Sequence, residues 1–145
     1  MRIRRMQAAD MIAIERQPSQ RVQLGIERTP TLDEAEDLAG EREAWTAEAD
    51  DGRLLACFGI RETFPDRQGV AWAVLATGIG GAHVGITRAA RRMIERSRLA
   101  RIEALARLSI EAECRWPTLV GLQPLAILRK FGAASEDHVL FERIG

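Results

Sequence analysis

Four glycines and a histidine join an apolar stretch of this sequence to an arginine-rich one. In "GIGGAHVGITRA" they are Gly78, Gly80, Gly81, His83 and Gly85. If residues 70–77 form a strand and residues 87–100 a helix, the join presents free backbone N–H groups at the positive end of the helix dipole, and its glycines permit close approach. Arg88 adds a side chain that pairs well with phosphate. Two interpretations stay open on these residues: a pyrophosphate site, or a tight turn between packed elements.

Few other side chains suggest chemistry. His83 is either a phosphate contact or base, or a solvated or capping residue of the join. His138 follows Asp137 at the start of an expected strand, and we expect it to be structural. Cys57 is expected to be a small core residue, whereas Cys114 is either catalytic or simply packed.

The composition is that of a protein able to build one hydrophobic core. The 145 residues are 46% hydrophobic, and we expect a single domain over residues 1–145. The 21 basic and 21 acidic residues cancel, which argues against attraction of the whole molecule to nucleic acid or membrane. No apolar run reaches the roughly 18 residues of a membrane span. Without a secretory pattern or metal-ligand spacing, we expect a cytoplasmic protein with no metal site.

The first forty residues predict one strand and two helices. Residues 2–6 alternate enough for a short strand, and residues 9–25 have the spacing of a helix that Pro18 must break or offset. Thr31, with Glu34 three residues later, predicts a capped helix that ends at Gly40.

The rest of the chain alternates between strand and helix patterns. Turn residues separate three expected strands, the last of them apolar on both faces and therefore central in a sheet. An amphipathic helix follows, then an ambiguous segment that we place as a strand, a helix ending near Gly121, and a closing antiparallel pair. The three expected strands cover residues 43–49, 53–63 and 70–77, and the amphipathic helix covers 87–100. The ambiguous segment is 101–109, the following helix is 110–117, and the closing pair is 125–131 and 138–144.

Several stretches resemble the GCN5-related N-acetyltransferase (GNAT) superfamily. They are "AWTAEADDGRLLACFGI", "GVAWAVLAT", "ECRWPTLVGL" and "HVLFERI". More narrowly, the chain looks like the small GNAT-like proteins of tailed bacteriophages called internal virion protein A. The resemblance implies a mixed α/β (α+β) fold with a mostly antiparallel sheet, helices on both faces, and a crossover from the fourth strand through a helix to the fifth.

The same resemblance implies a cofactor site. In the GNAT fold the fourth and fifth strands splay apart, and acetyl-CoA or another acyl-CoA lies between them. The pantetheine arm would pair with the backbone of Leu75, Ala76 and Thr77. The phosphates would meet the segment 80–88, through Gly80, Gly81, His83, Gly85 and Arg88.

The sequence departs from the GNAT pattern in three ways. The usual loop signature, Arg or Gln followed by two residues, Gly, one residue, and Gly or Ala, is not present in the join. The chain has no tyrosine to protonate the departing thiolate, and Cys114 or Ser109 would have to substitute. The expected fourth strand has no carboxylate to accept the amine's proton, and Glu103 is the nearest candidate.

Three functional hypotheses follow. The first is acyl transfer from acyl-CoA to a small-molecule or protein amine, in a phage or prophage protein. The alternative is a catalytically degenerate GNAT-fold protein that serves in virion assembly or binds a phage or host partner. The third is an RNA binder using the stripe Arg88, Arg92 and Arg96, which zero net charge and few aromatic residues disfavour.

Overall fold

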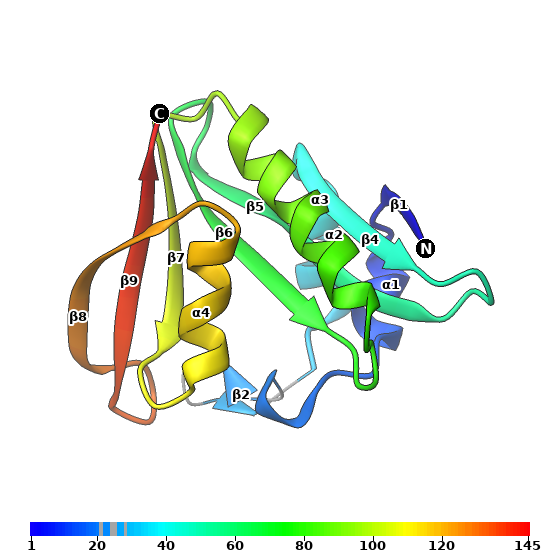
Figure 1. Cartoon of the computed structure of the whole chain (residues 1–145), viewed down its shortest axis with the longest axis horizontal. Coiled ribbons are helices and arrows are strands. Elements are labelled where there is room, and N and C mark those ends of the chain that lie inside the picture. Colours follow the sequence, from blue (N-terminus) through cyan, green and yellow to red (C-terminus); the bar gives the residue numbers. More distant parts are fainter. Residues whose placement is uncertain (21, 24–25, 28) are drawn as a thin grey trace.

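A seven-stranded sheet forms the centre of the computed structural model, which describes residues 1–20, 22–23, 26–27 and 29–145 (Figure 1). Its strands are β1 (Arg2–Arg5), β4 (Glu43–Glu48), β5 (Leu54–Phe64), β6 (Gln68–Leu75), β7 (Arg101–Arg107), β8 (Gln123–Phe131) and β9 (Glu136–Ile144). They are ordered β1-β4-β5-β6-β7-β9-β8. The pair β6–β7 is parallel and the other neighbouring pairs of this sheet are antiparallel. The expected fold class, mixed α/β with a mostly antiparallel sheet, is confirmed.

Helices cover both faces of the sheet, as expected (Figure 1). The guanidinium of Arg96 lies 5.4 Å from the ring centroid of Trp45 on β4. The next residue of β4, Thr46, donates a hydrogen bond to Asp10 at 3.0 Å. Because successive side chains of a strand point to opposite faces, the helices carrying Arg96 and Asp10 lie on opposite faces. The helices are α1 (Ala8–Ala13), α2 (Leu32–Ala39), α3 (Ala82–Arg96) and α4 (Glu111–Leu119).

The N-terminal strand was predicted correctly, but the long helix over 9–25 was not. Helix α1 ends at Ala13, since Ile14 is extended with φ −61° and ψ 129°. Pro18 begins a short 3-10 helix, η1 (Pro18–Gln20), because proline has no N–H for a helix interior and restricts the residue before it. The antiparallel strands β2 (Val22–Gln23) and β3 (Ile26–Glu27) follow, and residues 21, 24 and 25 of the predicted helix lie outside the described residues.

The predictions between residues 31 and 64 are confirmed. Thr31 caps α2, its hydroxyl accepting a hydrogen bond from the Glu34 N–H at 3.2 Å. Strands β4 and β5 form the predicted hairpin, and Gly52 in its turn has a φ of +86°, which glycine adopts at little cost.

Strand β6 is the middle strand of the sheet, in agreement with its apolar sequence. The helix after it begins at Ala82, five residues earlier than the predicted start at residue 87. His83 and Gly85 therefore lie inside α3 and not in a loop, whereas Arg88 lies in the helix as predicted. The prediction was wrong because it interpreted Gly85 as a loop residue, although a helix tolerates glycine at a cost of about 1 kcal/mol.

The C-terminal part follows the predicted order. The ambiguous segment after α3 is strand β7, which pairs with β9 along its whole length. Helix α4 continues two residues past Pro117 and is followed by Gly121, whose φ is +105°. Strands β8 and β9 are antiparallel, and β9 lies between β7 and β8.

Candidate functional site

The parallel neighbours β6 and β7 are paired at one end only. Three residue pairs join them, from Gln68 with Arg101 to Val70 with Glu103, and beyond these the strands part. Figure 1 shows the two strands apart at their far ends, with α4 beside the gap. A cleft of about 660 Å³ is lined by residues of both strands. The splayed pair implied by the family resemblance is therefore present.

This cleft passes through the sheet. Val74 of β6 lies opposite Cys57, and Cys57 lies opposite Thr46, so Val74 faces α1. By alternation Trp72 also faces α1, whereas Ala73 faces α3. All three residues line the cleft. Two ligands could therefore approach the gap between β6 and β7 from opposite faces of the sheet.

The end of β6 is held by the segment before η1 and by η1 itself. The Leu75 N–H donates to the side-chain oxygen of Gln20 at 2.5 Å, and its carbonyl accepts from the Gln17 N–H at 3.0 Å. The Ala76 carbonyl accepts from the Gln17 side chain at 3.2 Å, and the Thr77 N–H donates to the Glu15 carbonyl at 3.1 Å. Of the three residues expected to pair with pantetheine, Leu75 lines the cleft, and each of the three forms at least one backbone hydrogen bond with the segment 15–20.

The glycine join leads directly into the first turn of α3. The N–H groups of Ala82, His83 and Val84 donate to carbonyls three residues earlier, at 3.0 to 3.4 Å. Within the described parts of the chain, the N–H groups of Gly80 and Gly81 have no acceptor. Both residues are exposed, and the left-handed φ of +50° at Gly80 turns the chain into the helix. The join therefore presents two unsatisfied donors at the positive end of α3.

His83 and Arg88 lie on different sides of α3. His83 lines the cleft, and its Nδ1 is 3.3 Å from the hydroxyl of Thr87, which also accepts a hydrogen bond from Trp116 Nε1 at 2.9 Å. Arg88 is exposed, and none of the described residues forms an ion pair or hydrogen bond with it. Gly85 is half-buried against Met1, whose Cε would lie 2.5 Å from a Cβ at this position. Of these three, Arg88 is thus the side chain available to an anion.

His138 is the functional candidate that sequence reasoning missed. It is 3% exposed, lines the cleft on the α1 face, and lies opposite Arg107 on β7. Its Nδ1 is 2.9 Å from the carbonyl oxygen of Glu136, which can only accept, so Nδ1 carries the proton of the neutral ring. Nε2 then has a free lone pair. It forms no hydrogen bond with a described residue, so it can accept a proton from a group in the cleft.

The three catalytic candidates from the sequence do not line the cleft. Glu103 accepts a hydrogen bond from Arg101 at 2.6 Å. Ser109 is exposed beyond the end of β7. The thiol of Cys114 donates to the carbonyl of Arg107 at 3.3 Å, and desolvation and Glu113 raise its pKa. The sequence offered no pattern that separates these residues from His138, because only the pairing of β7 with β9 brings His138 to the cleft.

Cys57 has the structural role expected of it. The residue is fully buried beside Thr46, and burial raises the pKa of its thiol to about 11. A thiol of this kind is a poor nucleophile at neutral pH.

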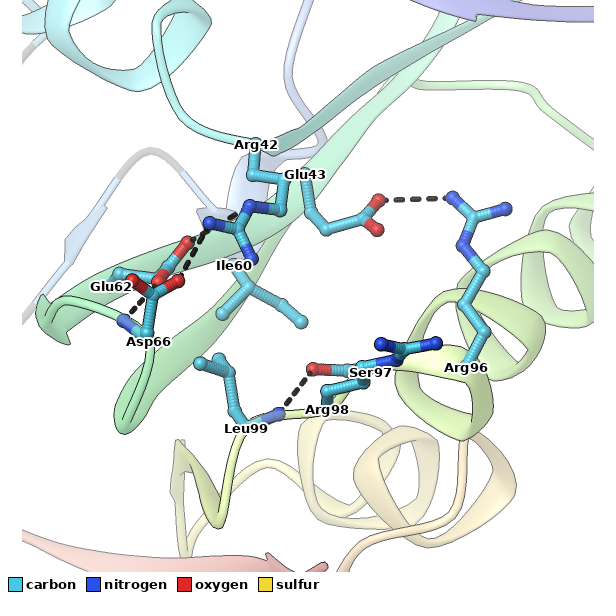
Figure 2. A pocket seen from close by; sticks show the side chains of 9 residues that line it. All are labelled: Arg42, Glu43, Ile60, Glu62, Asp66, Arg96, Ser97, Arg98 and Leu99. Atoms are coloured by element: carbon cyan, nitrogen blue, oxygen red, sulfur yellow. Dashed lines mark hydrogen bonds and ion pairs between the residues drawn. The ribbon is translucent and has the colours of Figure 1, made fainter.

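A second cavity, of about 400 Å³, lies beside the turn between α3 and β7 (Figure 2). Figure 2 shows four of its charged side chains in two pairs: Arg42 with Asp66 at 2.7 Å, and Arg96 with Glu43 at 3.0 Å. Because these four charges neutralise each other, we assign the chemistry to the larger cleft. Arg96 of the predicted arginine stripe is therefore engaged.

Two further observations concern the described residues only. They contain no group of three His, Cys, Asp or Glu residues that could hold a metal ion. Their helices include none that is both long and apolar enough to cross a membrane.

Known proteins match this chain in their three-dimensional structure. No protein-family model matches the sequence, and no curated protein matches it either. A ribosomal-protein-alanine N-acetyltransferase from Brucella melitensis superposes with a TM-score of 0.75 at 18% identity, over 100% of both chains. A GNAT superfamily phosphinothricin acetyltransferase from Sinorhizobium meliloti, solved with AcCoA, superposes with a TM-score of 0.76 at 14% identity, over 99% of this chain and 87% of the other.

The chain has the GNAT fold. A spermidine N-acetyltransferase variant from Vibrio cholerae shares this fold, with a TM-score of 0.66 at 14% identity over 99% of this chain and 95% of the other. The parallel pair β6–β7, joined through α3, is the GNAT crossover expected from the sequence.

Proposed function

We propose that this protein is an acyl-CoA-dependent N-acyltransferase. One observation carries the proposal: β6 and β7 part after three residue pairs and leave a cleft through the sheet. The solved structures of the same fold include a phosphinothricin acetyltransferase in complex with AcCoA, which supports an acyl-CoA as the cofactor.

The residues beside the cleft fit such a cofactor. The free N–H groups of Gly80 and Gly81, with the exposed guanidinium of Arg88, suit a pyrophosphate at the start of α3. The backbone of β6 from residue 71 to Val74, which has lost its β7 neighbour, suits an extended pantetheine arm. Leu75, Ala76 and Thr77, at the end of this segment, would contribute only after the segment 15–20 moves. When bound, acyl-CoA would supply an activated thioester as the acyl donor, and its transfer to the amine would release the CoA thiol, which takes up the proton that the amine loses.

The chain's own residues would orient the amine and move its proton. The amine enters from the α1 face, where the cleft is lined by Trp72, Leu105 and His138. His138 Nε2 accepts the proton that the amine must lose, while the Glu136 carbonyl holds the ring through Nδ1. A positioned base of this kind contributes roughly 10²- to 10⁴-fold to a rate. Glu103, Ser109 and Cys114 remain secondary proposals for proton transfer.

A titration of the chain with acetyl-CoA tests the proposal. Saturating acetyl-CoA raises the midpoint of thermal unfolding by mass action, and a ligand at 100 times its dissociation constant stabilises by about 2.7 kcal/mol. Mass spectrometry of a mixture of amines incubated with the protein and acetyl-CoA then identifies the acylated product. A folded sample whose midpoint does not respond to millimolar acetyl-CoA contradicts the proposal.

An unfolding midpoint that does not respond to acetyl-CoA would favour a non-catalytic role for the same fold, in virion assembly or in binding a phage or host partner. One observation supports this alternative: the backbone groups of Leu75, Ala76 and Thr77 are already bonded to the segment 15–20. The lack of any tyrosine in the chain points the same way.

A further inference from the structure

Trp72 carries a hydrogen-bond donor that the protein does not use. Among the described residues, its Nε1 is the buried side-chain nitrogen or oxygen without a partner. Leaving a buried donor unsatisfied destabilises the folded state, so such groups in folded proteins call for an explanation. Trp72 lines the cleft on the α1 face, which makes an unrecorded ligand the simplest explanation.

The position of the Trp72 ring depends on Gly59, its partner on β5. A Cβ at Gly59 would lie 3.0 Å from Cζ2 of the indole and closer still to the Glu43 carbonyl oxygen. Glycine therefore lets the ring lie against the sheet, where no other residue type fits without displacement. The packing that holds the indole in the cleft is thus built into two strands.

The guanidinium of Arg61 lies on the same face of the sheet as the Trp72 N–H. Arg61 is two residues beyond Gly59 on β5, so it is the diagonal neighbour of Trp72 on the same face. Diagonal neighbours lie roughly 7–8 Å apart, which long and aromatic side chains span. Arg61 is exposed, lines the same cleft, and has no ion pair or hydrogen bond with any residue that the structure describes. Two donors without acceptors therefore share one wall of the cleft.

The negative charge among the described lining residues of the cleft is already paired with an arginine. Of its described lining residues, Glu113 is the one carboxylate, and it holds Arg107 through the backbone N–H at 3.1 Å, Nε at 3.3 Å and Nη2 at 2.5 Å. A polyamine would find no free carboxylate there and would leave both donors unsatisfied. An oxygen-bearing anion meets both needs, since guanidinium and carboxylate form charge-assisted pairs.

We propose that the acceptor is an amino acid, whose carboxylate is bound by Arg61 and the Trp72 N–H while its amine points into the gap between β6 and β7. This inference rests on the proposed N-acyltransferase function and names its substrate class. Binding includes a local side-chain rearrangement, because the indole N–H is covered although the ring as a whole is only half-buried.

Calorimetric binding to the whole chain tests the inference without requiring turnover. The common amino acids and the amines produced by removing their carboxylates are titrated, with spermidine included, in the presence and absence of CoA. We expect at least one amino acid to bind ten times or more tightly than its matched amine and spermidine. Trp72→Phe and Arg61→Gln each reduce this preference about tenfold, whereas Arg129→Gln, on the exposed strand β8, leaves it unchanged.

Stability supplies a second readout. Trp72→Phe removes an unsatisfied donor, so the midpoint of unfolding stays within about 2 °C of the parent. Trp45→Phe is the matched control: it removes an N–H that donates to Glu43 at 2.5 Å, and it lowers the midpoint by about 3 °C or more. If Trp72→Phe lowers the unfolding midpoint as much as Trp45→Phe does, the argument that the Trp72 N–H has no partner in the protein is overturned.

The remaining outcomes are also decisive. Equal affinity for amino acids and amines, preference for spermidine, or binding of none of them overturns the inference. Failure of the proposed acyltransferase function gives a different result: amino acids would still bind with the expected preference, but acetyl-CoA would not bind.

Discussion

Gln20 and Leu75 are 55 positions apart, and the side-chain oxygen of Gln20 accepts a hydrogen bond from the Leu75 N–H at 2.5 Å. The neighbouring carbonyl of Ser19 accepts a hydrogen bond from the guanidinium of Arg107. Leu75 ends β6 and Arg107 ends β7, so η1 connects the two parted strands at their far ends. The segment both closes one end of the cleft and occupies a backbone donor that a ligand could use.

Removing the Gln20 side chain should strengthen cofactor binding. If acetyl-CoA pairs with the end of β6, it must first break the Gln20–Leu75 hydrogen bond, whose net contribution is about 0.5–1.5 kcal/mol. Gln20→Ala is therefore expected to lower the dissociation constant of acetyl-CoA about threefold to tenfold in a calorimetric titration. Gln123→Ala, on exposed β8, serves as control, and weaker binding by Gln20→Ala would mean that Gln20 itself contacts the cofactor.

Replacing His138 should separate chemistry from binding. His138→Gln removes the free Nε2 lone pair and is expected to lower kcat about 100-fold, with the dissociation constant of acetyl-CoA unchanged. His83→Gln provides the comparison, because His83 lines the same cleft but is bonded to Thr87. Equal losses in kcat for the two variants would argue against His138 as the base.

Charge reversal at the start of α3 tests the phosphate contact. Arg88→Glu places a carboxylate where we propose a pyrophosphate, so the unfolding midpoint gained with acetyl-CoA should fall by at least half. The free protein should keep its stability, because Arg88 is exposed and no described residue pairs with it. Arg129→Glu is the control for the added negative charge. An undiminished midpoint shift in Arg88→Glu would remove Arg88 from the site.

Asp10 anchors α1 to the sheet, and its loss should destabilise the fold. Its carboxylate accepts hydrogen bonds from Arg4 at 2.7 and 3.0 Å, from the Gln7 N–H at 2.8 Å and from Thr46 at 3.0 Å. Asp10→Asn leaves Arg4 without its main partner and is expected to cost about 2 to 3 kcal/mol in chemical denaturation. Asp37→Asn, an exposed change on α2, is the control.

The same carboxylate predicts how stability depends on pH. Burial opposes ionisation of Asp10, but the hydrogen bonds from Arg4, Gln7 and Thr46 outweigh burial and hold its pKa below the ordinary value of about 3.9. The unfolded chain therefore binds the proton more readily. The contribution is complete above about pH 5 and is lost as pH falls through the lowered pKa of the folded state. In unfolding curves measured between pH 2 and 6, the free energy of unfolding of Asp10→Asn should fall less with decreasing pH than that of the parent.

Local patterns in the sequence were enough to predict most of the elements. Thr31 and Gly40 set the ends of α2, Gly52 set the β4–β5 turn, and the apolar run of β6 identified the middle strand, because each depends on neighbours a few residues away. The same reasoning failed over residues 14–20. There Glu15, Gln17 and Gln20 form hydrogen bonds with residues 75–77, and no local spacing reveals such a partner.

The sequence by itself determined the order of the elements, and with it the fold class, because helical and strand periodicity are properties of short segments. Which side chains meet in the cleft was decided by tertiary structure alone. His138 comes from the last strand, Arg61 and Trp72 from a central hairpin, and Gln20 from the N-terminal segment. They share one cavity because β6 and β7 separate after Val70, and that separation depends on the packing of the whole sheet and its helices.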